Sequence, residues 1–249
     1  MTTGGVPMTR AEDLQAQVDG RWAELDQPAW PPARGFRDSP ADEEYSRVSD
    51  PARYRIVHER ARVWAEVLGE LPGVSLEPLG PGLIPVAGGD APLAPFRYDR
   101  GTRLVCDRPR TLPLLFLERS GGWPGEAQLA VLHIAVVEPG VTLSSHPGCG
   151  CDACDDGSEA VLESIDSAVL AVVGGPFALI RAPRWEARWH LDGSSSGGDG
   201  AGPDHEEVTA LCRRLAMGED PTLPRGARAY AGGSWRGPPA ALRTSGSVR

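Results

Sequence analysis

Two stretches in the first third of the chain place apolar residues at the spacing of an α-helix. The first predicts a short helix that begins at a capping box, Thr9–Glu12, and has one apolar face: Leu14, Val18, Trp22 and Leu25. The second begins at Asp50-Pro51, where Asp can cap a helix and Pro suits its first turn, and ends at Pro72-Gly73. Its apolar face comprises Tyr54, Val57, Ala61, Trp64, Leu68 and Leu71. The Pro-rich, acidic residues 26–44 are expected to be a linker.

From residue 74 onward, short apolar runs predict strands. The expected strands cover residues 74–79, 102–106, 112–118, 128–137, 141–146, 176–182 and 184–191. In the last of these, large apolar residues alternate with charged ones, which is the pattern of a half-buried strand. Residues 80–101 are rich in Pro and Gly, so a loop is expected there.

Two further helices are predicted in the second half of the chain. One begins at a capping box formed by Asp156 and Glu159 and ends at Gly174-Gly175. The other begins at Asp204 and carries Val208, Leu211 and Leu215. The Gly- and Ser-rich residues 192–204 are expected to form a flexible linker.

These elements predict an α+β fold, in which two or three helices pack on a mostly antiparallel sheet of about five to seven strands. The expected organisation is an N-terminal helix and linker over residues 1–45, an α+β domain over residues 46–218, and a disordered tail over residues 219–249.

Charge is distributed unevenly along the 249 residues. The net charge is −9, and every one of the 25 basic residues is Arg. No Arg or Lys occurs between Gly121 and Ile180, whereas that segment holds these acidic residues: Glu126, Glu138, Asp152, Asp155, Asp156, Glu159, Glu163 and Asp166. A field of this sign attracts cations and repels nucleic acid, so no nucleic-acid partner is expected.

Targeting signals are not evident in the sequence. The first ten residues lack the apolar core of a signal peptide, and the longest apolar run, residues 130–137, is too short to span a bilayer. We therefore expect a cytoplasmic protein with no membrane partner. Thiols stay reduced in that compartment, so clustered cysteines favour metal or redox chemistry over structural disulfides.

The stretch HPGCGCDACDDG, residues 146–157, is the most specific chemical signal. Its candidate ligands are His146, Cys149, Cys151 and Cys154. Cys-x2-Cys is the usual spacing of a zinc knuckle. A fifth candidate is His133, which would face His146 if Pro139-Gly140 formed a symmetric hairpin turn. A bulge that shifted the register by one residue would put the two histidines on opposite faces.

Three interpretations of this stretch remain open: a metal site, most simply Zn²⁺; a dithiol redox pair; or a Gly-rich loop in which the cysteines are incidental. The nearby Asp residues favour a divalent cation, because a reactive thiolate prefers positive neighbours. We expect these carboxylates to surround the ion. An iron–sulfur cluster would need a fourth Cys, from Cys106 or Cys212. The three cysteines are expected in one exposed loop before a helix that begins near Asp156.

The segments YSRVSDPARYRIVHERA and VVEPGVTLSSHPGCGCDAC, with the acidic helix that follows, resemble an uncharacterised actinobacterial-type family described only as a domain of unknown function. The resemblance covers roughly residues 40–218 and rests mainly on the D-P-x-R-Y start of the helix and on the H-P-x-C-x-C-x-x-C motif. It implies a bacterial cytoplasmic protein and no catalytic residue.

Taken together, the residues favour a non-catalytic binding or regulatory module with a small zinc site and a possible protein partner. The alternatives are a metalloenzyme or thiol-redox protein that uses the same loop, and an acidic, toxin-neutralising type of binding protein with incidental cysteines. No nucleophile elbow, P-loop or dinucleotide-binding motif is present.

Overall fold

The computed structural model describes residues 11–35, 38–85, 95–121, 129–198 and 202–236. Four α-helices lie in this part of the chain: α1 (Ala11–Ala23), α2 (Ile56–Gly69), α3 (Gly157–Val173) and α4 (His205–Ala216). A 3₁₀ turn at Pro51–Arg55 leads into α2, so the Pro at the predicted helix start begins a tighter turn before the α-helix proper. None of the helices is both long and apolar enough to cross a membrane.

Two main sheets and a small one form the β-structure, and every pairing within them is antiparallel. The first has the order β1-β4-β5-β6-β7 and comprises Val74–Leu79, Arg100–Cys106, Leu114–Ser120, Ala130–Val136 and Thr142–His146. The second has the order β10-β9-β8-β11 and comprises Gly193–Gly198, Trp185–His190, Phe177–Ala182 and Arg228–Gly232. The strands β2 (Gly82–Ile84) and β3 (Phe96–Tyr98) pair with each other. The α+β prediction is confirmed.

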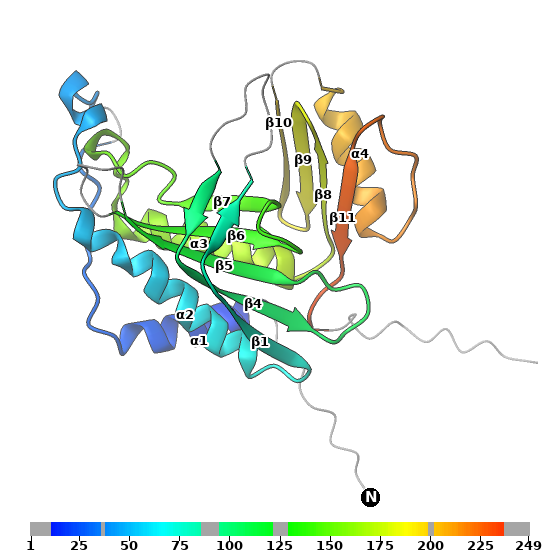
Figure 1. The fold of residues 1–249 in the computed structure, drawn as a ribbon, viewed down its shortest axis with the longest axis horizontal. Coiled ribbons are helices and arrows are strands. Elements are labelled where there is room, and N and C mark those ends of the chain that lie inside the picture. Colours follow the sequence, from blue (N-terminus) through cyan, green and yellow to red (C-terminus); the bar gives the residue numbers. More distant parts are fainter. Residues whose placement is uncertain (1–10, 36–37, 86–94, 122–128, 199–201, 237–249) are drawn as a thin grey trace, which may run out of the picture.

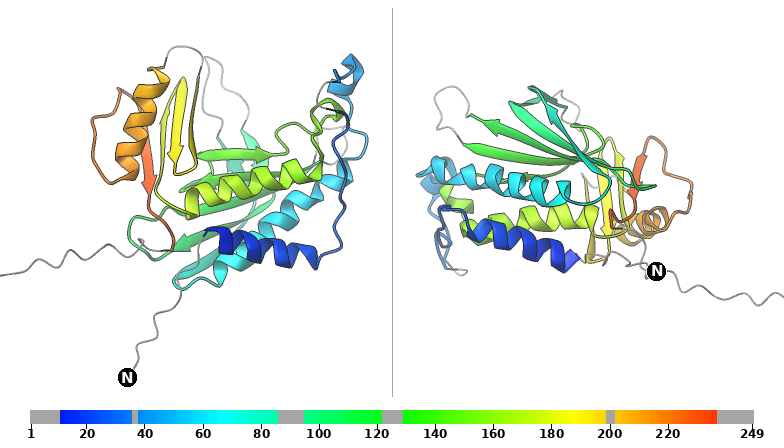
Figure 2. Two further views of the ribbon diagram at one scale, coloured as in Figure 1. Left: turned by 180° about the vertical axis from the view of Figure 1, so that it is seen from behind. Right: turned by 90° about the horizontal axis from the view of Figure 1, so that it is seen from below.

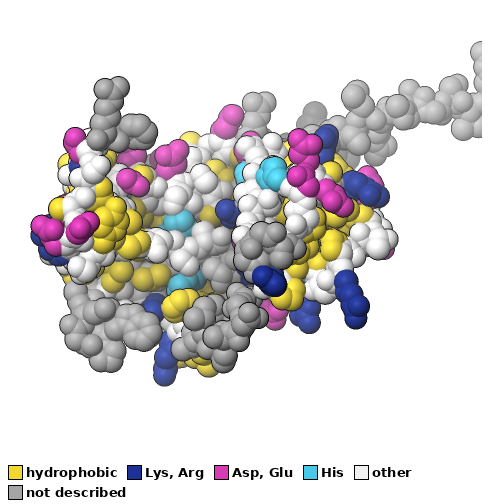
Figure 3. Space-filling view, turned by 90° about the horizontal axis from the view of Figure 1, so that it is seen from above, with side chains coloured by type: hydrophobic (Ala, Val, Ile, Leu, Met, Phe, Trp, Pro, Cys, Tyr) yellow, Lys and Arg dark blue, Asp and Glu magenta, His cyan; other side chains and the backbone are white. Residues whose placement is uncertain are grey.

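The helices α1, α2 and α3 form a layer on one face of the five-stranded sheet, and α4 covers the four-stranded sheet (Figures 1 and 2). In β5, Leu114 and Phe116 face the helices, whereas Leu115 and Leu117 face β2 and β3. Both faces of this strand are buried, which explains why its sequence is a continuous apolar run. Viewed from above, the molecule carries both acidic and Arg side chains, and neither sign of charge covers this face (Figure 3).

Three segments that lack strand-like sequence nevertheless form strands. The predicted loop at residues 80–101 contains β2 and β3, and β4 begins at Arg100, although residues 86–94 lie outside the described part. The predicted linker contains β10, whose side chains are mostly exposed and whose backbone pairs with β9. Here the hydrogen bonds of a neighbouring strand outweigh the low strand propensity of Gly and Ser.

The prediction of a disordered tail is wrong for residues 219–236. Strand β11 pairs with β8, and Trp235 is only 1% exposed within the main core. The Trp235 backbone N–H donates to the Val173 carbonyl at 3.2 Å, and its carbonyl lies 3.8 Å from the Cys106 thiol. The tail supplies the second partner of β8, on the edge opposite β9, a long-range effect that local composition does not reveal. Residues 237–249 lie outside the described part.

A buried ion pair joins the three helices of the first layer. Arg60 of α2 donates to Asp166 of α3 through Nε at 2.9 Å and Nη2 at 2.6 Å. Asp166 also accepts from Trp64 Nε1 at 2.6 Å and from Gln15 Nε2 of α1 at 2.8 Å. Arg60 reaches α1 as well, through Asp19 at 2.6 Å. Both carboxylate oxygens of Asp166 and two of the three guanidinium nitrogens of Arg60 are therefore hydrogen-bonded within the protein, which offsets part of the cost of burying two charges.

Replacing Asp166 by Ala should destabilise the fold by about 3–5 kcal/mol, because the buried Arg60 guanidinium would lose its partner. Asp19→Asn is the matched control: Asp19 contacts the same Arg60, but its side chain is 56% exposed, so we expect a loss of less than about 1 kcal/mol. Urea unfolding followed by circular dichroism measures both. Equal losses for the two variants would contradict the assignment of the buried pair.

Candidate metal centre

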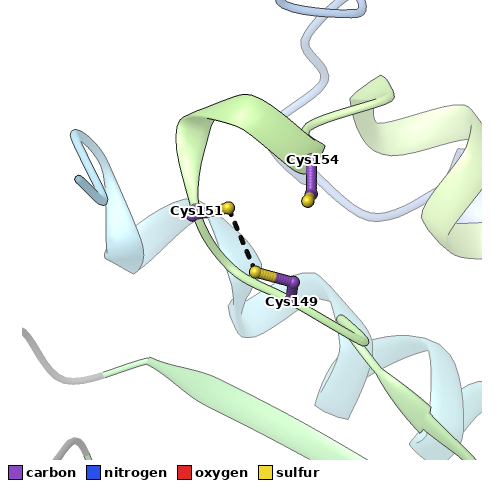
Figure 4. A group of neighbouring side chains, drawn as sticks. All are labelled: Cys149, Cys151 and Cys154. Carbon is purple, nitrogen blue, oxygen red and sulfur yellow. Dashed lines mark hydrogen bonds between the residues drawn. The ribbon is translucent and has the colours of Figure 1, made fainter. Parts of the chain in front are cut away.

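The three clustered cysteines lie on the loop between β7 and α3, with a 3₁₀ turn at Asp152–Cys154 (Figure 4). The Sγ atoms of Cys149, Cys151 and Cys154 all lie within 4.8 Å of one another, and the Cys149 Sγ lies 3.1 Å from that of Cys151. Cys149 and Cys154 are exposed, whereas Cys151 is buried, so the prediction of one exposed loop holds for two of the three. The helix that follows begins at Gly157, as predicted near Asp156.

Local geometry explains why these sulfurs converge. One turn of 3₁₀ helix repeats every three residues, so Cys151 and Cys154 lie on the same side of the turn. A Cβ at Gly150 would lie 2.5 Å from a methyl of Leu129, so Gly lets the loop pass this close without displacing the Leu129 side chain. The predicted Asp156–Glu159 capping box does not form; the Gly157 N–H instead donates to the Asp155 carboxylate at 3.1 Å.

The thiols are reduced, and they differ in acidity. All five cysteines are free, and 3.1 Å between sulfurs is far beyond a disulfide bond of about 2.05 Å. Burial raises the pKa of Cys151, but hydrogen bonds from the Cys149 and Cys154 thiols outweigh this and bring that pKa below its ordinary value. Donation to Cys151, together with burial, raises the pKa of Cys154 to about 11. These hydrogen bonds favour a thiolate on Cys151 over one on Cys154.

Two carboxylates that were expected to surround a cation bind arginines instead. Asp152 accepts from Arg47 Nε at 2.6 Å and from the Ser49 hydroxyl at 2.6 Å. The Ser49 hydroxyl, followed by Arg47, lowers the pKa of Asp152 to about 2. Asp155 accepts from Arg53 Nη2 at 2.7 Å and from the Trp30 indole N–H at 2.9 Å. The expected ring of carboxylates is thus wrong for this pair, because their charge is compensated from a distant segment.

That segment, residues 29–53, is called the N-terminal arm below. Arg34 Nη1 donates to the Ala153 carbonyl at 2.6 Å, and backbone hydrogen bonds link Trp30 with Ser158 and Arg47 with Asp152. Residues 29–44 of this arm were predicted to be a linker, and their hydrogen bonds to the cysteine loop were not predicted from the sequence. A signal was present: a segment of eight acidic residues without Arg or Lys needs basic partners from elsewhere in the chain.

Neither candidate histidine joins the group of three sulfurs. A bulge between Ile134 and Ala135 shifts the hairpin register, so His133 pairs with Ser145, and Leu132 pairs with His146. The predicted pairing of the two histidines is therefore wrong, and they lie on opposite faces of the sheet. The bulge accommodates the Pro139-Gly140 turn, whose geometry does not match the twist of a regular hairpin.

Both histidines are buried among other partners. The His146 ring lies between two hydroxyls, with Nδ1 2.7 Å from Ser164 Oγ and Nε2 2.8 Å from Ser144 Oγ. His133 Nδ1 lies 2.7 Å from Ser145 Oγ, and its ring stacks on Phe96 at 6.0 Å between centroids. Burial lowers the pKa of each histidine to about 4.

The remaining two cysteines do not complete the cluster. Cys106 lies in the core beneath α2, and Cys212 lies in the core beneath α4, with its sulfur 3.4 Å from the Ala187 carbonyl. Among the described residues, the chain therefore offers three thiols at the loop, and the fourth Cys that an iron–sulfur cluster would need is not brought there.

Acidification should destabilise the protein through His133 and His146. Both are neutral in the fold down to about pH 4, whereas the unfolded chain takes up protons near pH 6.5. Stability is therefore full above pH 6.5 and falls as the pH drops toward 4, by on the order of 2 kcal/mol for each histidine. Urea unfolding at several pH values measures this. His146→Gln should flatten the dependence, and His205→Gln, at an exposed site on α4, should leave it unchanged.

No curated protein and no solved structure matches this chain. One family model does match, that of a family of unknown function (DUF6226), over residues 18–237. The matched span includes the N-terminal arm, the cysteine loop and the second sheet through Trp235. It extends beyond residues 40–218, over which the resemblance was expected, at both ends. Because the match covers most of its length, this chain belongs to the DUF6226 family.

Proposed function

We propose that this protein is a metal-binding module in which Cys149, Cys151 and Cys154 hold a zinc ion as thiolates. The observation that supports the proposal is the convergence of three sulfur atoms within 4.8 Å on one loop. Thiolate sulfur is a preferred ligand of Zn²⁺, and Cys-x2-Cys is a common spacing in zinc sites. A tetrahedral site places sulfurs about 3.8 Å apart, so Cys149 and Cys151 would separate by roughly half an ångström or more on binding.

Charge around the loop supports a site with three thiolates. Three thiolates and one Zn²⁺ carry a net charge of about −1, which needs cationic neighbours when water is partly excluded. Arg34 donates to carbonyls of the loop, and Arg47 donates to Asp152 beside Cys151. The N-terminal arm therefore places two guanidinium groups beside the loop, and each is also ion-paired with a carboxylate: Arg34 with Glu44 and Arg47 with Asp152.

The fourth coordination position would be filled from outside the cluster. No His, Asp or Glu of the described residues joins the three sulfurs, so water or a ligand from a partner would complete the site. An open fourth position is also a feature of catalytic zinc sites, so coordination number alone does not separate a binding module from a metalloenzyme. Free thiols must be maintained, which favours a reducing compartment such as the cytoplasm.

Bound metal would also stiffen the contact with the N-terminal arm. The loop and the arm share the hydrogen bonds of Asp152, Asp155 and Ser158. An ion that fixes the cysteines would fix these carboxylates, and through them Arg47, Arg53 and Trp30. Occupancy of the site is thereby coupled to a surface segment that a partner protein could recognise, which is the basis of the regulatory role proposed here.

Thiol–disulfide exchange is the second candidate, and the 3.1 Å contact between Cys149 and Cys151 favours it. In this chemistry the Cys151 thiolate would attack a disulfide of a partner, and Cys149 would then displace the mixed disulfide. Two protein thiols would become a disulfide while the partner disulfide was reduced to two thiols. The Cys154 thiol forms no bond to sulfur in that exchange, whereas it is a direct ligand in the zinc site, and this separates the two candidates experimentally.

Protein purified without a His-tag should contain one zinc per chain by elemental analysis, with three thiols protected until a chelator is added. Serine at Cys149, Cys151 or Cys154 should each weaken binding by more than about 100-fold, because each removes a direct ligand. Cys212→Ala and His146→Gln should keep the metal. Cobalt(II) substitution reports the number of thiolates through its charge-transfer absorption.

Two results would contradict the zinc proposal. One is protein without metal whose thiols react equally with and without a chelator. The other is a Cys149–Cys151 disulfide that forms reversibly in glutathione buffers, with Cys154→Ser unchanged in this respect, which would establish the redox candidate in its place.

A further inference from the structure

A groove runs along the outer side of α3, next to the cysteine loop. Its first part is a hollow of about 590 Å³ between the N-terminal arm and the start of α3, and its second part is a hollow of about 420 Å³ between α1 and α3. Glu159 and Glu163 line both hollows, so the two are adjacent along α3. Figure 2 shows α1 and α3 side by side in the helical layer, with the chain that follows α1 rising toward the start of α3.

One wall of the groove is apolar and held rigidly in place. Ala29, Pro31 and Pro32 are exposed along it, and Trp30 lies between them. The Trp30 indole donates to Asp155, and the Arg53 guanidinium lies 4.8 Å from its ring centroid. Gly157 has a φ of +87°, and a Cβ there would lie 2.8 Å from Pro32 N, so the wall fits closely against α3. The groove is therefore formed before any partner arrives.

The opposite wall carries carboxylates that the fold does not use. Asp156, Glu159 and Glu163 are exposed, and none of them makes a side-chain hydrogen bond or ion pair within the described part of the chain. Asp152, Asp155 and Asp166, from the same acidic segment, are all bound to arginines. The buried acidic residues are thus paired with Arg, whereas Asp156, Glu159 and Glu163 line the groove without a basic partner in the described chain.

We propose that this groove docks an extended, basic segment of a partner protein, with Arg or Lys at alternate positions. Glu159 and Glu163 are four residues apart on α3, about 6.0 Å along the axis, and alternate residues of an extended chain are about 6.6 Å apart. Basic side chains at that spacing can meet successive carboxylates of α3. The residues between them point away from α3 and can pack on Pro31 and Pro32 of the opposite wall.

Charge complementarity selects this occupant. The three free carboxylates repel phosphate, so a nucleic acid or a phosphorylated segment would not bind here. A basic segment would form charge-assisted hydrogen bonds at the groove, and its apolar stems would cover the exposed prolines. This inference concerns a surface separate from the cysteine ligands and does not depend on a bound metal.

The test uses a short fluorescein-labelled peptide of alternating Arg and Ala, with binding to the full chain followed by fluorescence anisotropy at low and physiological salt. The double variant Glu159→Gln/Glu163→Gln should bind at least about tenfold more weakly, because both groove charges are lost. The double variant Glu206→Gln/Glu207→Gln is the matched control, since it removes the same charge from exposed positions on α4. It should bind as the wild type does.

A second variant tests position rather than net charge. Ala160→Lys places a cation inside the first hollow and should block the peptide while leaving the thermal midpoint unchanged, because Ala160 is only half-buried. Three results would overturn the proposal: no binding by the wild-type chain, equal weakening in both Gln double variants, or undiminished binding by Ala160→Lys.

Other occupants of the groove give distinct results. A synthetic peptide of residues 237–249 that binds more tightly than the Arg-Ala peptide would assign the groove to this chain's own C-terminal segment. A dimer in sedimentation velocity that the Glu159→Gln/Glu163→Gln variant converts to a monomer would assign it to a second copy. Either result would overturn docking of a separate basic partner.

Discussion

The ion pair between Arg60 and Asp166 is the constraint on which the helical layer depends. Two charges lie in the core, and they are tolerated because Trp64, Gln15 and Asp19 complete their hydrogen bonds. These contacts fix α1, α2 and α3 relative to one another, and apolar burial alone would allow the helices to slide. Since α3 begins where the cysteine loop ends, the same pair also sets the position of the loop against the sheet.

In the acidic segment between residues 121 and 180, each buried carboxylate of the described chain is paired with an Arg from the first sixty residues. The three pairs are Asp152 with Arg47, Asp155 with Arg53, and Asp166 with Arg60. Charge separated along the sequence is therefore recombined in space, and the N-terminal arm is held against α3 by that attraction. The described acidic residues of the segment that lack an Arg partner are exposed: Asp156, Glu159 and Glu163 along the groove, and Glu138 beside the turn between β6 and β7.

The sequence predicts those helices and strands whose buried side chains follow a regular spacing along the chain. The periodicity of α2 and the apolar runs of β5 and β6 identify those elements, because burial acts on each side chain separately. Strands β10 and β11 escaped prediction because their stability comes from pairing with β9 and β8. Burial of Trp235 likewise depends on a cavity that distant segments build, so composition alone suggested disorder.

The same distinction applies to the candidate site. Cys149, Cys151 and Cys154 converge because a glycine-bordered turn brings them together, and their spacing foretold this. His133 depended on the register of a hairpin, and a single bulge moved it to the other face. The His146 ring is enclosed by Ser144 and Ser164, so the loop offers three thiols as ligands. Two of these, Cys149 and Cys154, are exposed. A metal held there would keep one coordination position open to the surroundings, because the described chain brings three ligands to the loop and a tetrahedral site takes four.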